Sequence, residues 1–250
     1  MRFACGRVNR GRRLAPALRS CESGRVLRTT AQAKRQGRYM SKRSLQPILE
    51  QTRLLHEALS DLWDDLPAPD SSRSLLVAGF CEIVRQHALS QVILADAEID
   101  VTATTLVRPA FEALVRATWC MGGAGEEWIQ KFLSPNPEAL ASDAETAMGP
   151  SVQKMLDDIS EHHPAHIHQT LVELKKSTWR AMHSYVHGGI RPFMQVLVGF
   201  QEHEVAGVVV NANGMMLWAT NLLRMSRGAQ SPQLPDLQRR YSACLPSVNS

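Results

Sequence analysis

Three features are missing from this 250-residue sequence, and each absence argues against a class of protein. No apolar run approaches the roughly 18–20 residues that span a bilayer, so we expect no membrane span. The five cysteines are scattered without a CxxC pair, which argues against a disulfide framework or a zinc finger and favours a reducing, cytoplasmic setting. No glycine-rich loop follows a strand-like segment, which argues against a nucleotide site of the Rossmann or P-loop type.

Acidic residues are almost missing from the N-terminal part. Residues 1–45 hold 13 Lys and Arg against one acid, Glu22, a balance of +12. Residues 46–250 hold 15 Lys and Arg against 23 acids, a balance of −8. The net charge of +4 therefore describes neither part, and it does not indicate that the folded part binds nucleic acid.

Residues 1–43 are predicted to form a disordered basic leader, because they show no sustained helical or strand period. A secretory signal is excluded, since no apolar core of roughly 7–15 residues follows the basic start. A mitochondrial-type transit peptide and a basic arm that contacts RNA both fit the composition. A third interpretation is that translation begins at Met40. We favour this start or plain disorder.

From residue 44 onward the periodicity is helical almost everywhere, which predicts an all-α protein. We expect a single helical bundle over residues 44–228 and a flexible C-terminal tail over residues 229–250, which holds three prolines. The expected helices span about 44–65, 70–95, 102–121, 126–133, 137–147, 152–161, 165–186, 191–200 and 204–225.

Arg180, His183 and His187 share one face at the end of the long helix expected over residues 165–186. Seven residues at about 100° each bring His187 to within roughly 20° of Arg180, and His183 lies between them. A cation and two imidazoles together are costly unless they meet an acid, a phosphate or water. Arginine holds a phosphate with paired hydrogen bonds and histidine transfers a proton near neutral pH. This face is therefore suited to an RNA phosphodiester.

Two other interpretations of this face stay open. His183 and His187 have the i, i+4 spacing of metal ligands, but the glutamate of an HExxH motif and a third ligand are missing. Arginine and histidine in the last helical turns also complement the helix dipole.

A second motif repeats charge every four residues, at Arg108, Glu112 and Arg116. It is either a solvated ladder, worth about a few tenths of a kcal/mol per pair, or a stripe whose Glu112 is partly covered. In the second case we expect Glu112 to pair with Arg180 or His187. Pro109 predicts a kink or a helix start at this point.

Four histidines lie close together, at positions 162, 163, 166 and 168. They straddle Pro164 and lack both cysteine and regular helical spacing, so we interpret them as a solvated turn. The sequence assigns no metal and no cofactor.

The Arg180-x6-His187 element resembles the RNase motif of the HEPN (higher eukaryotes and prokaryotes nucleotide-binding) superfamily. Residues 106–119, LVRPAFEALVRATW, and 183–189, HSYVHGG, resemble uncharacterised bacterial helical families near its abortive-infection branch. In order of elements the resemblance covers about residues 70–225.

The resemblance implies a cytoplasmic homodimer of defence or toxin–antitoxin type, with an antitoxin protein as partner, that cuts single-stranded RNA without a metal. Arg180 would hold the phosphate, His187 would transfer the proton and Glu112 would orient them. The supporting residues would be His183, Arg108, Arg116 and Tyr185. One departure is Ala181, where active members often carry a polar residue.

The alternative is a non-catalytic scaffold or interaction module, in which Arg180, Glu112 and His187 form a buried polar network that fixes the helices. A third hypothesis is a small-molecule or nucleotide pocket between helices. Exposure of Arg180 and His187 would favour the enzyme, and burial would favour the scaffold.

Overall fold

A computed structural model describes residues 45–134 and 149–247, apart from the side chains of Ser177 and Arg180. Within these ranges the chain is helical and holds no strand, which confirms the all-α fold class. The predicted leader, 1–43, and the predicted helix 137–147 lie outside the described residues. The helices are residues 45–64, α2 (Ser72–Asp96), α3 (Asp100–Thr105), α4 (Val107–Gly122), α5 (Glu126–Leu133), α7 (Val152–His162), α8 (Ala165–Val186), α9 (Ile190–Val198), α10 (Glu202–Ser226), α11 (Leu234–Arg240) and the 3₁₀ turn η2 (Ser242–Cys244).

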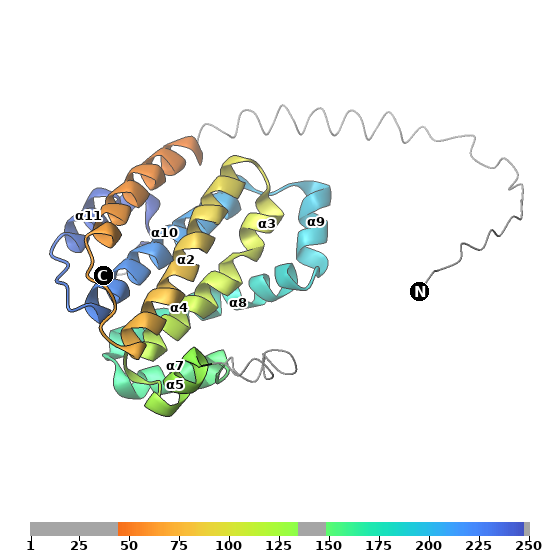
Figure 1. Cartoon of the computed structure of the whole chain (residues 1–250). Coiled ribbons are helices and arrows are strands. Elements are labelled where there is room, and N and C mark those ends of the chain that lie inside the picture. Colours follow the sequence, from red (N-terminus) through yellow and green to blue (C-terminus); the bar gives the residue numbers. More distant parts are fainter. Residues whose placement is uncertain (1–44, 135–148, 248–250) are drawn as a thin grey trace, which may run out of the picture. The chain divides into compact units, whose positions relative to one another are not determined.

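Three long helices form the centre of the bundle (Figure 1). α2 packs against both α4 and α10, and these two also contact each other. α7 and α8 cover the remaining sides of α4, so that Phe111 and Leu114 are fully buried. None of the described helices is both long and apolar enough to span a membrane.

Several helix bounds follow from local sequence alone. The Ser71 hydroxyl accepts a hydrogen bond from the Ser74 amide at 3.2 Å, as expected for an N-cap before α2. Ser151 caps α7 in the same way, through the Lys154 amide. The bounds predicted for 126–133 and 165–186 are confirmed by α5 and α8.

The helix predicted over residues 102–121 is in fact two helices. α3 ends at Thr105 and α4 begins at Val107, with Leu106 between them. Pro109 has no N–H to bond the Thr105 carbonyl, so the ladder is interrupted, and proline is tolerated in the first turn of the new helix. The helix start is therefore the correct one of the two alternatives for Pro109.

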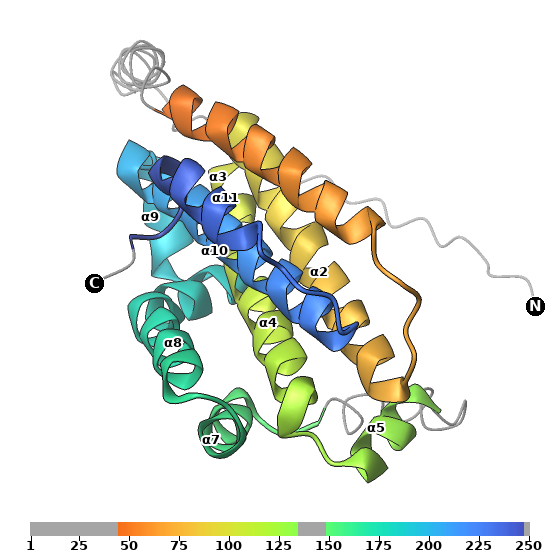
Figure 2. The same cartoon turned by 90° about the vertical axis from the view of Figure 1, so that its left-hand side faces the viewer.

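The C-terminal residues are not the loose tail that we predicted for 229–250. Residues 234–244 form α11 and η2, with Leu234, Tyr241 and Leu245 buried. They pack against helix 45–64 and α10, for example against Leu59 and Met216 (Figure 2). The three prolines misled the prediction, because one of them, Pro235, lies in the first turn of α11, where proline is tolerated.

A buried polar network fixes this C-terminal segment. The Asn213 amide on α10 donates to Thr52 Oγ1 at 2.7 Å and to the Cys244 carbonyl at 2.8 Å. His56 Nε2 lies 2.9 Å from Asn213 Oδ1, which accepts because the amide nitrogen is the donor. Burial lowers the pKa of His56, so the ring is held neutral.

Candidate functional site

The charged stripe on α4 is a partly covered ion-pair cluster. Arg108 Nε donates to Glu112 Oε1 at 2.8 Å, and Arg116 Nη1 lies 3.9 Å from Glu112 Oε2. The side chains of Arg108, Glu112 and Arg116 are 22%, 22% and 15% exposed. Glu112 thus holds two guanidinium groups of its own helix. The i, i+4 pairs are those of the predicted ladder, and their partial cover is the feature expected of the second alternative.

The row on α8 that meets this stripe has the same four-residue spacing. Its members are Lys175, Trp179, His183 and His187. Residues spaced by four lie along one side of a helix, and two such rows pack together where helices cross. α4 and α8 are in contact, so the two rows meet at this crossing.

Trp179 is the apolar centre of the crossing. The Arg108 guanidinium lies 4.6 Å from the centre of the Trp179 ring, and Lys175 Nζ lies 5.3 Å from it. Phe111 contacts the same ring edge-on, with centroids 6.3 Å apart. A cation over an indole face is worth about 0.5–2 kcal/mol, depending on exposure. Trp179 therefore holds Arg108 in place from the side that Glu112 does not.

The histidine pair adjoins this cluster and is open to solvent. Arg108 Nη1 lies 3.2 Å from His183 Nδ1. The rings of His183 and His187 are 4.5 Å apart, and both residues are exposed. Because a guanidinium only donates, His183 Nδ1 is the acceptor, and the ring proton of this neutral tautomer is on Nε2. The cluster therefore presents imidazoles beside a fixed cation.

Two further predicted site residues are Arg180, whose side chain lies outside the described residues, and Tyr185. Arg180 lies on α8 by its backbone, one residue after Trp179, and its predicted role stays a prediction. Tyr185 is buried and packs against Phe200, with ring centroids 6.2 Å apart. Burial raises the pKa of Tyr185 to about 12. We expected Tyr185 to support the site, but it points into the packing between α8 and the chain before α10.

Lys175 and Trp179 are the residues that sequence reasoning missed. A signal for them exists, because they continue the four-residue spacing of His183 and His187 toward the N-terminus of α8.

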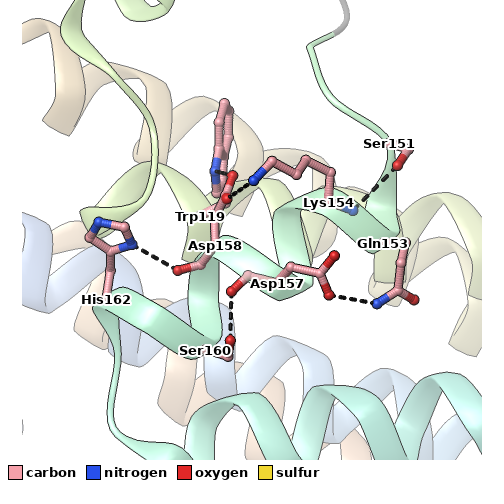
Figure 3. A network of polar contacts seen from close by, with 8 residues as sticks. All are labelled: Trp119, Ser151, Gln153, Lys154, Asp157, Asp158, Ser160 and His162. Atoms are coloured by element: carbon pink, nitrogen blue, oxygen red, sulfur yellow. Dashed lines mark hydrogen bonds and ion pairs between the residues drawn. The ribbon is translucent and has the colours of Figure 1, made fainter.

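A second polar cluster lies on α7 (Figure 3). Trp119 Nε1 of α4 donates to Asp158 Oδ2 at 3.0 Å, and Lys154 Nζ donates to Asp158 Oδ1 at 2.6 Å. The hydrogen bond from Lys154 is the main cause that lowers the pKa of Asp158, and the one from Trp119 adds to it. This cluster joins α7 to α4, so we interpret it as structural.

The run of four histidines is divided between two helices. His162 closes α7, where its Nδ1 lies 2.8 Å from the Asp158 carbonyl oxygen. His163 is half-buried between the helices, and burial lowers its pKa. His166 and His168 lie in the first turn of α8. Among the described residues no group of three or more His, Cys, Asp or Glu is arranged to hold a metal ion.

Comparison with known proteins yields one family. No curated protein and no solved structure matches the chain. Residues 81–247 match a family of unknown function, DUF6988, and this range contains both rows of the α4–α8 crossing. It covers well over half of the 250 residues. The chain therefore belongs to the DUF6988 family of unknown function.

Proposed function

We propose that the α4–α8 crossing binds the phosphate backbone of single-stranded RNA and that the protein is a HEPN-like, metal-independent endoribonuclease of defence or toxin–antitoxin type. The observation that carries the proposal is the Arg108–His183 contact, which joins a fixed guanidinium to an exposed histidine pair. The proposal includes a cytoplasmic location, a homodimer and an antitoxin partner.

Local charge supports an anionic ligand. Arg108, Arg116 and Lys175 stand against one carboxylate, Glu112, so the cluster is positive although residues 46–250 carry −8 overall. A phosphodiester is a suitable ligand for guanidinium groups, which bind two of its oxygens together. An uncharged sugar or base would leave this excess charge without a partner.

The cleavage reaction removes a proton from the RNA 2′-hydroxyl and adds a proton to the leaving O5′ oxygen. The RNA 2′-oxygen attacks the phosphorus, a new 2′-O–P bond forms, and the P–O5′ bond breaks to leave a 2′,3′-cyclic phosphate and a 5′-hydroxyl. His187 is the residue that moves a proton between these oxygens and solvent, because it is exposed and free of ion pairs with the described acids. Arg180 holds the phosphate, and Arg108, placed by Glu112 and Trp179, positions His183.

The non-catalytic scaffold keeps one specific observation in its favour. Arg108, Glu112 and Arg116 satisfy one another and are only 15–22% exposed. A network of this kind fixes two helices without any ligand. The two functions differ in His187, which is exposed and would be dispensable in a scaffold.

The test is cleavage of a single-stranded RNA by the full chain in EDTA. We expect His187→Ala and Arg180→Ala to lower the rate by about 100-fold or more, the usual size of a general acid–base or charge-stabilising contribution. The matched control is His166→Ala, which removes an exposed histidine about 30 Å away on the same helix. It should leave the rate unchanged.

The same variants separate the two functions. An enzyme loses cleavage while its melting temperature stays within a few degrees of the wild type. If the wild type cuts no RNA, the ribonuclease proposal is wrong. Variants at Arg108 and Glu112 that then lower the melting temperature support the scaffold.

A further inference from the structure

α9 carries its apolar side on the outside of the protein. Its exposed large side chains are Ile190 (67%), Phe193 (59%), Met194 (43%), Val196 (71%), Leu197 (55%) and Val198 (59%), and we call this set the α9 face. The side toward the bundle holds the buried Pro192 and the polar Gln195. An ordinary surface helix has the reverse arrangement, with its apolar stripe inward.

The arrangement follows from helical geometry. At about 100° per residue, five of the six members fall within an arc of roughly 140° on one side, and Val196 lies about 60° beyond Phe193 at its edge. Gln195 lies on the other side, where its Nε2 donates to Glu204 Oε2 at 2.9 Å.

No described element lies over the outer side of this helix. α9 contacts α8 and α3, its Gln195 bonds Glu204 in the first turn of α10, and the helix stands at one edge of the bundle (Figure 1). Its six exposed side chains present on the order of 700 Å² of apolar surface, above the roughly 300–600 Å² of the largest patch on a typical monomer.

Area and charge both fit a second copy of this chain. A standard interface buries about 800 Å² on each partner, which is close to what the α9 face offers. A two-fold interface brings a patch against itself, so a patch with charges of one sign repels its copy. The α9 face has no charged member, and the single charged residue of the helix, Arg191, lies at its margin. A membrane surface fits poorly, because an interfacial helix is flanked by several Lys or Arg and α9 has one.

We propose that the α9 face is the homodimer interface, with two α9 helices packed against each other about a two-fold axis. The proposal assigns a surface to the homodimer included in the proposed function, but it requires no RNA chemistry.

The test is the mass of the full chain in solution, measured by light scattering or sedimentation during dilution from about 100 μM, because interfaces of standard size have dissociation constants from micromolar to picomolar. We expect the wild type to have twice the chain mass of 27.8 kDa. Phe193→Glu and, independently, Leu197→Lys should raise the dissociation constant at least 100-fold, so that they give the single-chain mass at concentrations where the wild type is still dimeric. Circular dichroism should show unchanged helix content, because both side chains are exposed.

The matched control is Leu75→Glu, a similar change at a 49% exposed apolar residue in the first turn of α2. It should stay dimeric. A monomeric wild type overturns the proposal, and so does a dimer that survives both α9 variants. If Leu75→Glu dissociates as well, the interface is elsewhere. None of these results depends on RNA cleavage, which is scored separately with His187→Ala.

Discussion

Arg108 and His183 are 75 residues apart in sequence, yet Arg108 Nη1 and His183 Nδ1 lie 3.2 Å apart where α4 crosses α8. The contact joins the ion-pair cluster of α4 to the exposed histidines of α8. Because Glu112 and Trp179 also hold Arg108, the guanidinium occupies one defined position beside the histidines.

The two residues should therefore be coupled energetically. We expect Arg108→Ala to lower the free energy of unfolding by about 1–2 kcal/mol, since it removes a partly covered ion pair and a cation–indole contact. His183→Ala should cost less, and the double variant should deviate from additivity by about 0.5 kcal/mol or more. Urea unfolding measures all three. Arg53→Ala is the control: its pair with Glu57 is more than half exposed, so the change should stay below about 0.5 kcal/mol. Strict additivity of the two site variants would show that the contact carries no energy.

Asn213 should be the most sensitive polar residue of the core. Replacing it with Ala removes the hydrogen bonds that His56, Thr52 and the Cys244 carbonyl make to its side chain, at a cost of about 2–4 kcal/mol. The C-terminal segment should then become accessible to carboxypeptidase. Asn211→Ala, on the same helix but partly exposed, should have a much smaller effect on both measurements. Equal effects would mean that Asn213 does not hold the C-terminal segment.

Stability should fall in mild acid through His56. Burial lowers its pKa in the folded state, so below about pH 6.5 the unfolded chain binds the proton more readily than the folded one. The stabilisation is therefore complete above that pH and is lost as the pH falls toward the folded pKa. His87 and His163, whose pKa values burial also lowers, contribute with the same sign.

The measurement is the free energy of unfolding between pH 5 and pH 8, the range around the ordinary histidine pKa. His56→Gln keeps a donor for Asn213 but cannot titrate, so its slope against pH should be shallower than that of the wild type by at most about 1.4 kcal/mol per pH unit. Identical slopes would exclude His56 as a source of the acid sensitivity.

Gly123 should not tolerate a side chain. A Cβ there would lie 2.7 Å from Trp119 Cδ1 and 3.2 Å from Asp158 Cβ, inside the cluster that joins α7 to α4. Gly123→Ala should therefore cost about 1–3 kcal/mol through overpacking, read from the melting temperature. A Cβ added at Gly207 of α10 would have no atom within 4 Å. Gly207→Ala should therefore be neutral or stabilise the helix by about 0.5–1 kcal/mol. A neutral Gly123→Ala would mean that the Trp119 ring moves freely.

Local patterns predicted the helices well, and tertiary contacts much less well. The apolar period and the residues that bound each helix, such as Gly125 before α5 and Pro164 before α8, lie within one segment, so these two helices were predicted to the residue. The α3–α4 break was missed because the period continues across Leu106, although Pro109 marked the position. The C-terminal helix was missed because its stability comes from Leu59 and Asn213, far away in sequence.

The candidate site was likewise predicted in its local features but not in its tertiary contacts. The spacing placed Arg108, Glu112 and Arg116 on one face, and His183 and His187 on another, from helical geometry alone. It did not show that the two faces meet, nor that Trp179 lies between them, because the crossing of α4 and α8 is set by the packing of the whole bundle. The pairs that Glu112 makes with Arg108 and Arg116 are those of the i, i+4 ladder, and its expected pair with Arg180 stays a prediction.

The central claim is that RNA binds at the exposed histidines of α8. Its most direct test is the nuclear magnetic resonance spectrum of the histidine side chains, nine in the chain, during titration with a 2′-O-methyl single-stranded oligonucleotide, which binds but has no attacking hydroxyl. The account predicts shifts of the His183 and His187 resonances, with His166 and His203 unchanged, and loss of these shifts in Arg108→Ala. Shifts confined to other histidines, or no shift at RNA concentrations up to about 1 mM, well above the roughly 1–100 μM range of non-specific nucleic-acid binding, would contradict it.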